Sequence, residues 1–232
     1  MLKRTPLALA LVAIAGAAQA TVITQWNFNS VSPDGTLTTG STDPSIGTGT
    51  ASLIGGTTST FASGTGGSDP AASDNTAWNS ASYPAQGVGS GTAGVRFLVS
   101  TVGMQGITVS FDQRHSATAS AWTMLQYTTD GTTWNNSSSF QVSDTVFHNL
   151  NIVDLSGDSS VNNNAKFGVR IVSVFAPGSS QYTPTTSTAT YSINGTIRYD
   201  MVTISGTQGV PEPMTMSILG LGALALARRA RK

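Results

Sequence analysis

Short runs of alternating apolar and polar residues are the main pattern of this chain. Over residues 95–100, Val95, Phe97 and Val99 alternate with Arg96, Leu98 and Ser100. Residues 107–111 repeat this alternation after a turn with glycines at positions 103 and 106. Successive side chains of a strand point to opposite faces, so the pattern predicts strands with one buried face.

Similar patterns predict further strands over residues 22–29, 51–54, 122–128, 147–154, 166–174, 189–193 and 196–205. Only 9% of the residues are charged, and Gly, Ser, Thr and Asn are frequent, which disfavours helices. About eight to ten short strands with Gly- or Asn-rich connections predict an all-β fold, an antiparallel β-sandwich of the jelly-roll kind.

Residues 40–94 are rich in Gly, Ser and Thr and show one clear strand pattern, at residues 51–54. A structureless run of this length is unusual inside a compact domain. We therefore expect further strands in this region, whose positions the pattern does not give.

The first 20 residues have the features of a signal peptide. Lys3 and Arg4 precede an apolar run, Leu7 to Ala18, and Ala18-Gln19-Ala20 is a small-residue cleavage site. We predict an N-terminal signal helix that signal peptidase removes after Ala20, following export by the Sec machinery.

The last 23 residues combine three features in an order that a globular domain does not require. Val210-Pro211-Glu212-Pro213 is followed by an uncharged run from Met214 to Ala227. At about 1.5 Å per helical residue this run spans roughly 21 Å, less than the roughly 30 Å hydrocarbon core, so it predicts a short transmembrane helix. The basic tail ends the segment and favours a cytoplasmic end; it consists of Arg228, Arg229, Arg231 and Lys232.

This arrangement resembles the PEP-CTERM sorting signal of Gram-negative bacteria. The resemblance covers the tail alone. It implies export, transient anchoring in the inner membrane, and processing near Val210 to Pro213 by an exosortase, a membrane-embedded cysteine protease or transpeptidase. The residues of the motif are then recognised by the enzyme and perform no chemistry themselves.

The predicted division is therefore a signal peptide (1–20), a β-sandwich domain (21–209) and a sorting signal (210–232). The body contains five basic residues and ten aspartates, a net charge of −5, and the chain contains no cysteine. Nucleic acid is an unsuitable partner for an acidic body, because phosphate binding requires basic clusters. The absence of cysteine also excludes thiolate catalysis and cysteinyl metal sites.

The segment from Tyr127 to Trp134, with Asp130-Gly131 at its centre, predicts a hairpin. It resembles the Tyr-Ser-x-Asp-Gly-x-Thr-Trp hairpin of bacterial extracellular sandwich domains. It is also similar to the Asp-box of sialidase-type propellers, but those boxes recur in each blade and this chain has one copy.

The sequence contains few residues that would support an enzymatic function. Glycoside hydrolysis needs two carboxylates across a sugar cleft, and the candidates are aspartates alone: Asp112, Asp130, Asp144, Asp154, Asp158 and Asp200. The two histidines, His115 and His148, are interpreted as surface or packing residues. We therefore expect no enzyme activity and no cofactor.

Calcium is a weak candidate ligand at Asp200. The residue resembles the last-strand aspartate of jelly-roll carbohydrate-binding domains, which implies a structural Ca²⁺, and Asn27 or Asn29 would supply an oxygen opposite it. The alternative is that Asp200 pairs with Arg198 or another arginine.

Carbohydrate binding would use exposed aromatic side chains as stacking surfaces. Trp78 and Tyr83 are the preferred platform, since no strand alternation in their segment demands burial; Trp122, Trp134 and Tyr182 are further candidates.

Together, these features predict a non-enzymatic protein of the cell surface or extracellular matrix, linked by the resemblance to exopolysaccharide and biofilm formation. The alternatives are a carbohydrate-binding module, which would bind polysaccharide through an aromatic platform, and a secreted glycoside hydrolase with a paired-carboxylate cleft.

Overall fold

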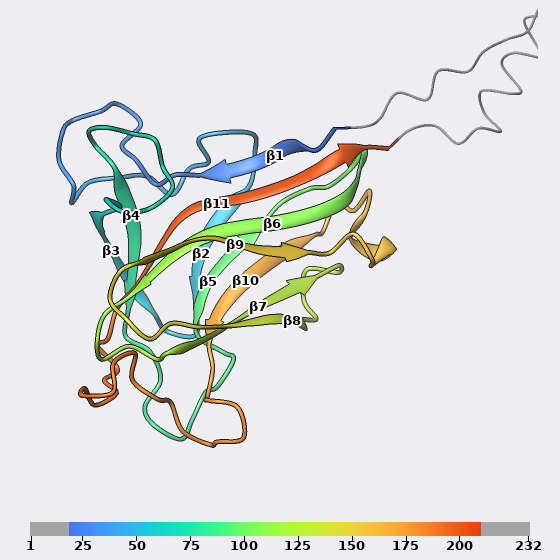
Figure 1. Ribbon diagram of the computed structural model, residues 1–232. Helices are drawn as coiled ribbons and strands as arrows, with labels where there is room; N and C mark the ends of the chain where they lie inside the picture. Colours follow the sequence, from blue (N-terminus) through green and yellow to red (C-terminus); the bar gives the residue numbers. More distant parts are fainter. Residues whose placement is uncertain (1–18, 210–232) are drawn as a thin grey trace, which may run out of the picture.

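The computed structural model describes residues 19–209, which form two antiparallel β-sheets packed face to face (Figure 1). The predicted signal helix and transmembrane helix lie outside the described residues. Within residues 19–209, no helix is long and apolar enough to cross a membrane. The described part is thus all-β, as predicted, with one short 3-10 helix, η1 (Ser159–Val161).

Sheet A has the strand order β3-β4-β11-β6-β9, and β1 also pairs with β11. Its strands are β1 (Thr21–Trp26), β3 (Thr58–Ser63), β4 (Thr76–Ala81), β6 (Met104–His115), β9 (Phe147–Asp154) and β11 (Ile197–Gln208). Sheet B has the order β2-β5-β10-β7-β8. Its strands are β2 (Thr50–Ile54), β5 (Gly94–Leu98), β7 (Trp122–Thr128), β8 (Asn135–Gln141) and β10 (Gly168–Ser173).

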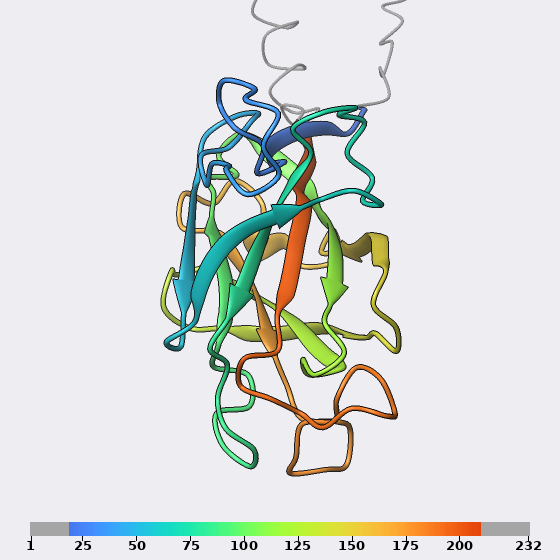
Figure 2. The same ribbon diagram turned by 90° about the vertical axis from the view of Figure 1, so that its left-hand side faces the viewer.

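The first and last strands lie side by side at one edge of the molecule. Thr21 of β1 is opposite Gly206 of β11 in the antiparallel register. Both ends of the described chain therefore leave the sandwich at the same end, which two views at right angles confirm (Figures 1 and 2).

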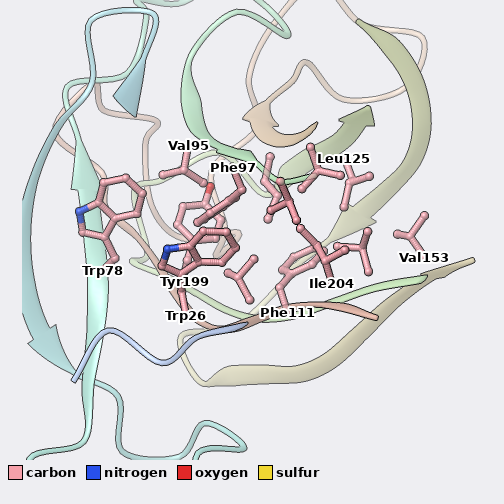
Figure 3. Packing of buried hydrophobic residues seen from close by; sticks show 14 of the residues in the cluster. Trp26, Trp78, Val95, Phe97, Phe111, Leu125, Val153, Tyr199 and Ile204 are labelled. Carbon is pink, nitrogen blue, oxygen red and sulfur yellow. The ribbon is translucent and has the colours of Figure 1, made fainter. Parts of the chain in front are cut away.

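A cluster of aromatic rings joins the two sheets in the core (Figure 3). Phe97 of sheet B packs against Trp26 and Trp78 of sheet A, with ring centroids 4.9 and 6.2 Å apart. Phe28, which follows β1, stacks on Trp78 at 5.6 Å. The three rings nearest to Phe97 come from the N-terminal segment and from β4, so this cluster ties sequence-distant parts of the chain together.

Most predicted strands are confirmed, and those over residues 122–128 and 147–154 have the predicted bounds. The expectation of unplaced strands in residues 40–94 is also confirmed, since β3 and β4 lie there beside β2. The predicted strand at residues 189–193 is wrong. Tyr191 in this segment instead stacks on Tyr182, at 4.7 Å between ring centroids, and donates a hydrogen bond to the Pro84 carbonyl oxygen.

Replacement of Phe97 by Ala is expected to lower the free energy of unfolding by about 3–5 kcal/mol, because it removes a fully buried ring and leaves a cavity between the sheets. Urea denaturation of the variant and of the parent protein measures this difference. Val102→Ala, at a side chain that is 58% exposed, serves as the control and should change stability little. Equal effects of the two variants would contradict the central place given to Phe97.

Candidate functional site

Two aspartates face each other on the outer side of sheet A. Asp112 of β6 is opposite Asp200 of β11, and both side chains are fully buried. The β6–β11 register shifts just after Asp200, and the β6–β9 register shifts between Phe111 and Gln113. These bulges interrupt the regular ladder where the two carboxylates lie.

Backbone amides hold three of the four carboxylate oxygens. Asp112 accepts hydrogen bonds from the Ser68 amide to Oδ2 (2.5 Å) and from the Leu150 amide to Oδ1 (2.7 Å). Asp200 Oδ1 accepts one from the Met201 amide at 2.7 Å. Leu150 and Met201 have φ angles of 53° and 47°, in the left-handed region that side chains disfavour. The chain therefore adopts a strained backbone at two of the positions that bind these carboxylates.

The connection between β3 and β4 covers this pair of aspartates and adds further oxygens. Asp200 Oδ2 and Asn75 Oδ1 are buried and have no hydrogen-bond partner. A methyl group placed on Gly67 would lie 3.1 Å from Asp200 Oδ2, 3.3 Å from Asp112 Oδ2 and 3.0 Å from the Gly64 carbonyl oxygen. One placed on Gly64 would clash with Asn75 Oδ1 and lie 2.7 Å from Asp200 Oδ2. Four oxygens thus lie close together: Asp112 Oδ2, Asp200 Oδ2, Asn75 Oδ1 and the Gly64 carbonyl oxygen. Gly64 and Gly67 have no side chain that would fill the space between these oxygens.

The electrostatics of this cluster are unfavourable without a cation. Burial is the main cause that raises the pKa of Asp200, the Met201 amide bond opposes it, and the charges of Asp69 and Asp112 add to it, so that the pKa reaches about 9. Asp69 is itself held by Asn29, whose amide donates to Asp69 Oδ2 at 2.7 Å. Without a cation, the Asp200 carboxyl therefore keeps a proton at neutral pH.

Carboxylate, amide and carbonyl oxygens are the ligands that Ca²⁺ prefers in proteins. Residues 19–209 contain no group of three or more His, Cys, Asp or Glu side chains placed to hold a metal ion. A cation here would therefore depend on Asn75 Oδ1 and the Gly64 carbonyl as well as on Asp112 and Asp200. The unpartnered oxygens fit such a hard cation, and we define the oxygens of these four residues as the candidate cation site.

A hollow of about 420 Å³ lies beside the candidate cation site. Gly67, Asp69, Asp74 and Asn75 are among its lining residues. Both carboxylate oxygens of Asp74 are buried without a hydrogen-bond partner. Two further aspartates, Asp69 and Asp74, thus line a hollow next to the candidate cation site.

The sequence placed Asp200 in this site but named the wrong neighbours. Asn29 Oδ1 accepts the Thr76 amide, and Asn27 Oδ1 accepts the Asn29 amide, so neither is aimed at Asp200. The expected arginine partner is also wrong, since Arg198 donates to the Ser63 carbonyl oxygen. Asp112 was named as a candidate glycosidase carboxylate and not as a neighbour of Asp200, and Asn75 was not named, because the alternation of β6 and the composition of the β3–β4 connection carry no signal for this pairing.

The predicted aromatic platform is wrong. Trp78 and Tyr83 are 3% and 5% exposed, and both belong to the core. Trp78 stacks on Phe28, and the Tyr83 hydroxyl hydrogen-bonds the Ser80 hydroxyl at 2.6 Å. Tyr182 is likewise buried, whereas Trp122 and Trp134 are half-buried. Trp78 is buried because β4, a strand that the sequence pattern did not reveal, turns it into the sandwich.

The predicted Asp-Gly hairpin is confirmed between β7 and β8. Asp130 Oδ1 accepts the amides of Thr132 and Thr133, each at 2.7 Å, and these bonds lower the pKa of Asp130. Gly131 has a φ of 83°, which a glycine adopts without strain. Asp130 is therefore a turn residue bound to its own backbone.

The two histidines are the packing and surface residues that the sequence predicted. His115 is fully buried on β6, and its Nδ1 lies 2.7 Å from the Ser120 carbonyl oxygen. Burial lowers the pKa of His115 to about 4. His148 is partly exposed and lies 2.9 Å from Asp144 Oδ1. One ring is therefore enclosed among buried polar groups, and the other is partly solvated.

The residues of the predicted sorting motif, basic tail and signal-cleavage site lie outside the described residues, apart from Ala20. The sequence profile of the PEP-CTERM protein-sorting motif matches residues 209–232. The chain therefore carries this motif, which implies an exosortase-processed surface protein.

Three solved structures are similar to this chain at low identity and low TM-score. The CBM22-1 xylan-binding domain of Paenibacillus barcinonensis Xyn10C is 9% identical, with a TM-score of 0.44 over 84% of this chain and 100% of that chain. The K1 cleaved adhesin domain of Lys-gingipain from Porphyromonas gingivalis is 14% identical, with a TM-score of 0.40 over 70% and 100%. The family 29 carbohydrate-binding module CBM29_1 of Piromyces equi is 13% identical, with a TM-score of 0.35 over 68% and 91%. No curated protein sequence matches the chain.

Addition of Ca²⁺ to the chelator-treated full chain is expected to raise the Tm by several degrees, because the cation binds the folded state alone. Asp200→Asn should abolish most of this rise, since it removes a charged ligand while keeping the shape of the side chain. Calorimetry with and without Ca²⁺ measures both effects. Asp154→Asn, at an aspartate that caps the Ser156 amide, is the control and should keep the rise. An unchanged Tm of the parent protein on Ca²⁺ addition would exclude the site.

Asp200 and His115 have opposite effects on the free energy of unfolding between about pH 6.5 and pH 4. Asp200 keeps its proton in the folded protein and releases it in the unfolded chain, so it stabilises the fold as the pH decreases. His115 is expected to lower the free energy of unfolding over the same window, because the unfolded chain protonates this histidine and the folded protein does not. This group contributes a slope of up to about 1.4 kcal/mol per pH unit. Urea denaturation across this window measures it. His115→Gln should reduce the slope by about one proton. An equal slope in the His115 variant would show that this histidine is not the titrating group.

Proposed function

We propose that the protein is an exported, non-catalytic protein of the cell surface or extracellular matrix that exosortase processes at its C-terminal motif. In this proposal residues 1–20 direct export through the Sec machinery and are removed by signal peptidase. Residues 210–232 anchor the chain transiently in the inner membrane, and residues 21–209 form the exported body. A role in exopolysaccharide or biofilm formation belongs to the same proposal.

The match of residues 209–232 to the sorting motif is the observation that carries the proposal. The position of the body ends supports it. Thr21 and Gly206 are paired neighbours, so the N-terminus left after signal cleavage and the start of the sorting segment lie at one end of the sandwich. This geometry is compatible with attachment of the body through the sorting segment.

The surroundings of the paired aspartates support a non-catalytic role. Asp112 and Asp200 face each other, as a glycosidase pair would, but both are enclosed and three of their four oxygens accept backbone amides. A sugar ring has no access to the space between them. Their arrangement suits a structural cation better than glycoside hydrolysis.

A carbohydrate-binding module is the second candidate function of the body. The outer face of sheet B favours it, because polar side chains follow one another across all of its strands and the half-buried ring of Trp134 lies at its edge. Sugars are bound by such combinations of hydrogen-bonding groups and aromatic rings. In this proposal, Trp134 replaces the platform that the sequence had predicted at Trp78 and Tyr83.

Glu212→Ala is expected to leave unprocessed protein in the membrane, because the variant removes the acidic side chain between the two prolines of the motif. Intact mass of the protein from exosortase-positive and exosortase-deletion strains measures processing. Gln208→Ala, at an exposed residue at the end of β11, is the matched control and should be processed normally. The same mass in both strains would contradict processing by exosortase.

A further inference from the structure

A row of polar side chains crosses the outer face of sheet B. In the antiparallel registers, Arg96 of β5 is opposite Ser52 of β2 and Arg170 of β10, and Gln126 of β7 is opposite Arg170 and Asn136 of β8. We call these five residues the arginine row. The chain neighbours of the two arginines, Val95, Phe97, Val169 and Ile171, are fully buried in the core. Strand alternation therefore points both guanidinium groups away from the core.

Hydrogen bonds hold the row in place but use few of its donors. Arg96 Nε donates to Ser52 Oγ at 3.1 Å, and Arg170 Nε donates to Gln126 Oε1 at 2.5 Å. Gln126 Nε2 donates in turn to Asn136 Oδ1 at 2.6 Å. In the described part of the chain, the two terminal nitrogens of Arg96 have no protein acceptor, and Arg170 makes one long bond, 3.5 Å, to the Gly91 carbonyl oxygen. The guanidinium ends are thus oriented and still able to donate.

Neither arginine is paired with a carboxylate in the part of the chain that the structure describes. Among residues 19–209, the ion pair within 4.0 Å is that of His148 with Asp144, so neither guanidinium has a carboxylate partner. Two aspartates near the ends of the sheet B strands have other hydrogen-bond partners. Asp130 accepts the amides of the hairpin, and Asp158 accepts the Tyr127 hydroxyl. Like charges directly opposite each other on a sheet are destabilising. Burial and the charge of Arg96 both lower the pKa of Arg170.

Apolar and basic groups border the row. The Arg170 guanidinium lies over the Trp134 ring, 4.6 Å from its centroid. Two residues beyond Arg96, Leu98 lies close over Gly168, since a methyl group there would be 2.6 Å from Leu98 Cδ2. Leu98 also lines a hollow of about 420 Å³ together with Thr50, Gly131 and Lys166. The face therefore offers an aromatic ring, an aliphatic side chain and a third cationic residue beside the row.

We propose that the arginine row binds a carboxylated polysaccharide, with uronate carboxylates on Arg96 and Arg170. Guanidinium groups bind carboxylates in a bidentate manner. Gln126, Asn136 and Ser52 supply hydrogen-bonding groups for sugar hydroxyls, and Trp134 and Leu98 supply apolar surface for sugar rings. The body as a whole has a net charge of −5, so this local pair of positive charges is not part of a generally basic surface. The inference rests on the carbohydrate-binding function proposed above and names its ligand class.

The test compares polygalacturonate with the same polymer after methyl esterification of its carboxyls. The full chain in non-ionic detergent should bind polygalacturonate. Its affinity for the methyl ester should be lower by roughly tenfold or more, because each lost charge-assisted contact is worth at least about one decade of affinity. This comparison uses the parent protein and is independent of the folding of any variant. Isothermal titration calorimetry measures both affinities.

Variants locate the binding on the sheet. Arg96→Gln with Arg170→Gln should weaken polygalacturonate binding by roughly tenfold or more. Arg114→Gln is the matched control and should bind normally. Arg114 and Arg198 are also opposite each other and half-buried, but they lie on sheet A, two residues along their strands from Asp112 and Asp200. Equal loss in the control variant would overturn the assignment to the arginine row.

The remaining outcomes separate this inference from the functions proposed above. Equal binding of the acidic polymer and its ester would overturn the acidic ligand class and leave carbohydrate binding in place. If the protein binds neither polymer, both the acidic ligand class and the carbohydrate-binding function are contradicted. Tighter binding of single-stranded poly-dT than of polygalacturonate would overturn the choice of a polysaccharide. Processing by exosortase is measured by intact mass and does not depend on any of these results.

Discussion

Packing of Phe97 between the sheets determines what the two faces of sheet B carry. Its ring is fully buried against the aromatic rings of sheet A, at 4.9 Å from Trp26. Because strand side chains alternate, Phe97 in the core requires Arg96 and Leu98 on the outer face. A shift of one residue in β5 would bury a guanidinium and expose the ring. The core therefore fixes the position of the arginine row, although no core residue belongs to it.

The outer faces of the two sheets differ in whether their charged groups are covered by other parts of the chain. On sheet A, the β3–β4 connection covers Asp112 and Asp200 and brings Gly64 and Asn75 to them, so that charge is enclosed. On sheet B, the arginine row stays open, and its like charges are left without carboxylates. Enclosed charge of one sign favours a small ion, because few ligands fit. Open, oriented charge favours an extended ligand that can exchange with water.

The fold was largely predictable from the sequence, and the candidate sites were not. Strands such as residues 122–128 alternate clearly, and an Asp-Gly turn pins the hairpin that follows. The segment of β3 and β4 is mainly small and polar. Its strands form because β4 pairs with β11 and buries Trp78, and β3 pairs with β4 and packs Phe61 against the core, rather than through their own pattern. Strand pairing thus buries Trp78, although the local sequence pattern had predicted an exposed side chain.

Residue pairs across strands explain why the sites escaped the sequence analysis. Arg96 and Arg170 are far apart in the chain and become neighbours through the β5–β10 register. The same holds for Asp112 and Asp200, where bulges in addition change which residues share a face. Register and bulges depend on packing between sheets and leave little trace in local alternation. The resemblance pointed to Asp200 as a candidate ligand, whereas the residues that surround it in the candidate cation site emerge from the three-dimensional arrangement alone.

The arrangement of the sheets makes attachment and ligand binding compatible. The sorting segment continues from β11, which lies in sheet A beside β1. The arginine row lies on the outer face of sheet B, and packed sheets are separated by about 10 Å of core. The strand that leads to the sorting segment is therefore on the far side of the core from the row. A body held at its β1–β11 end can present the arginine row to a polymer without releasing its tail.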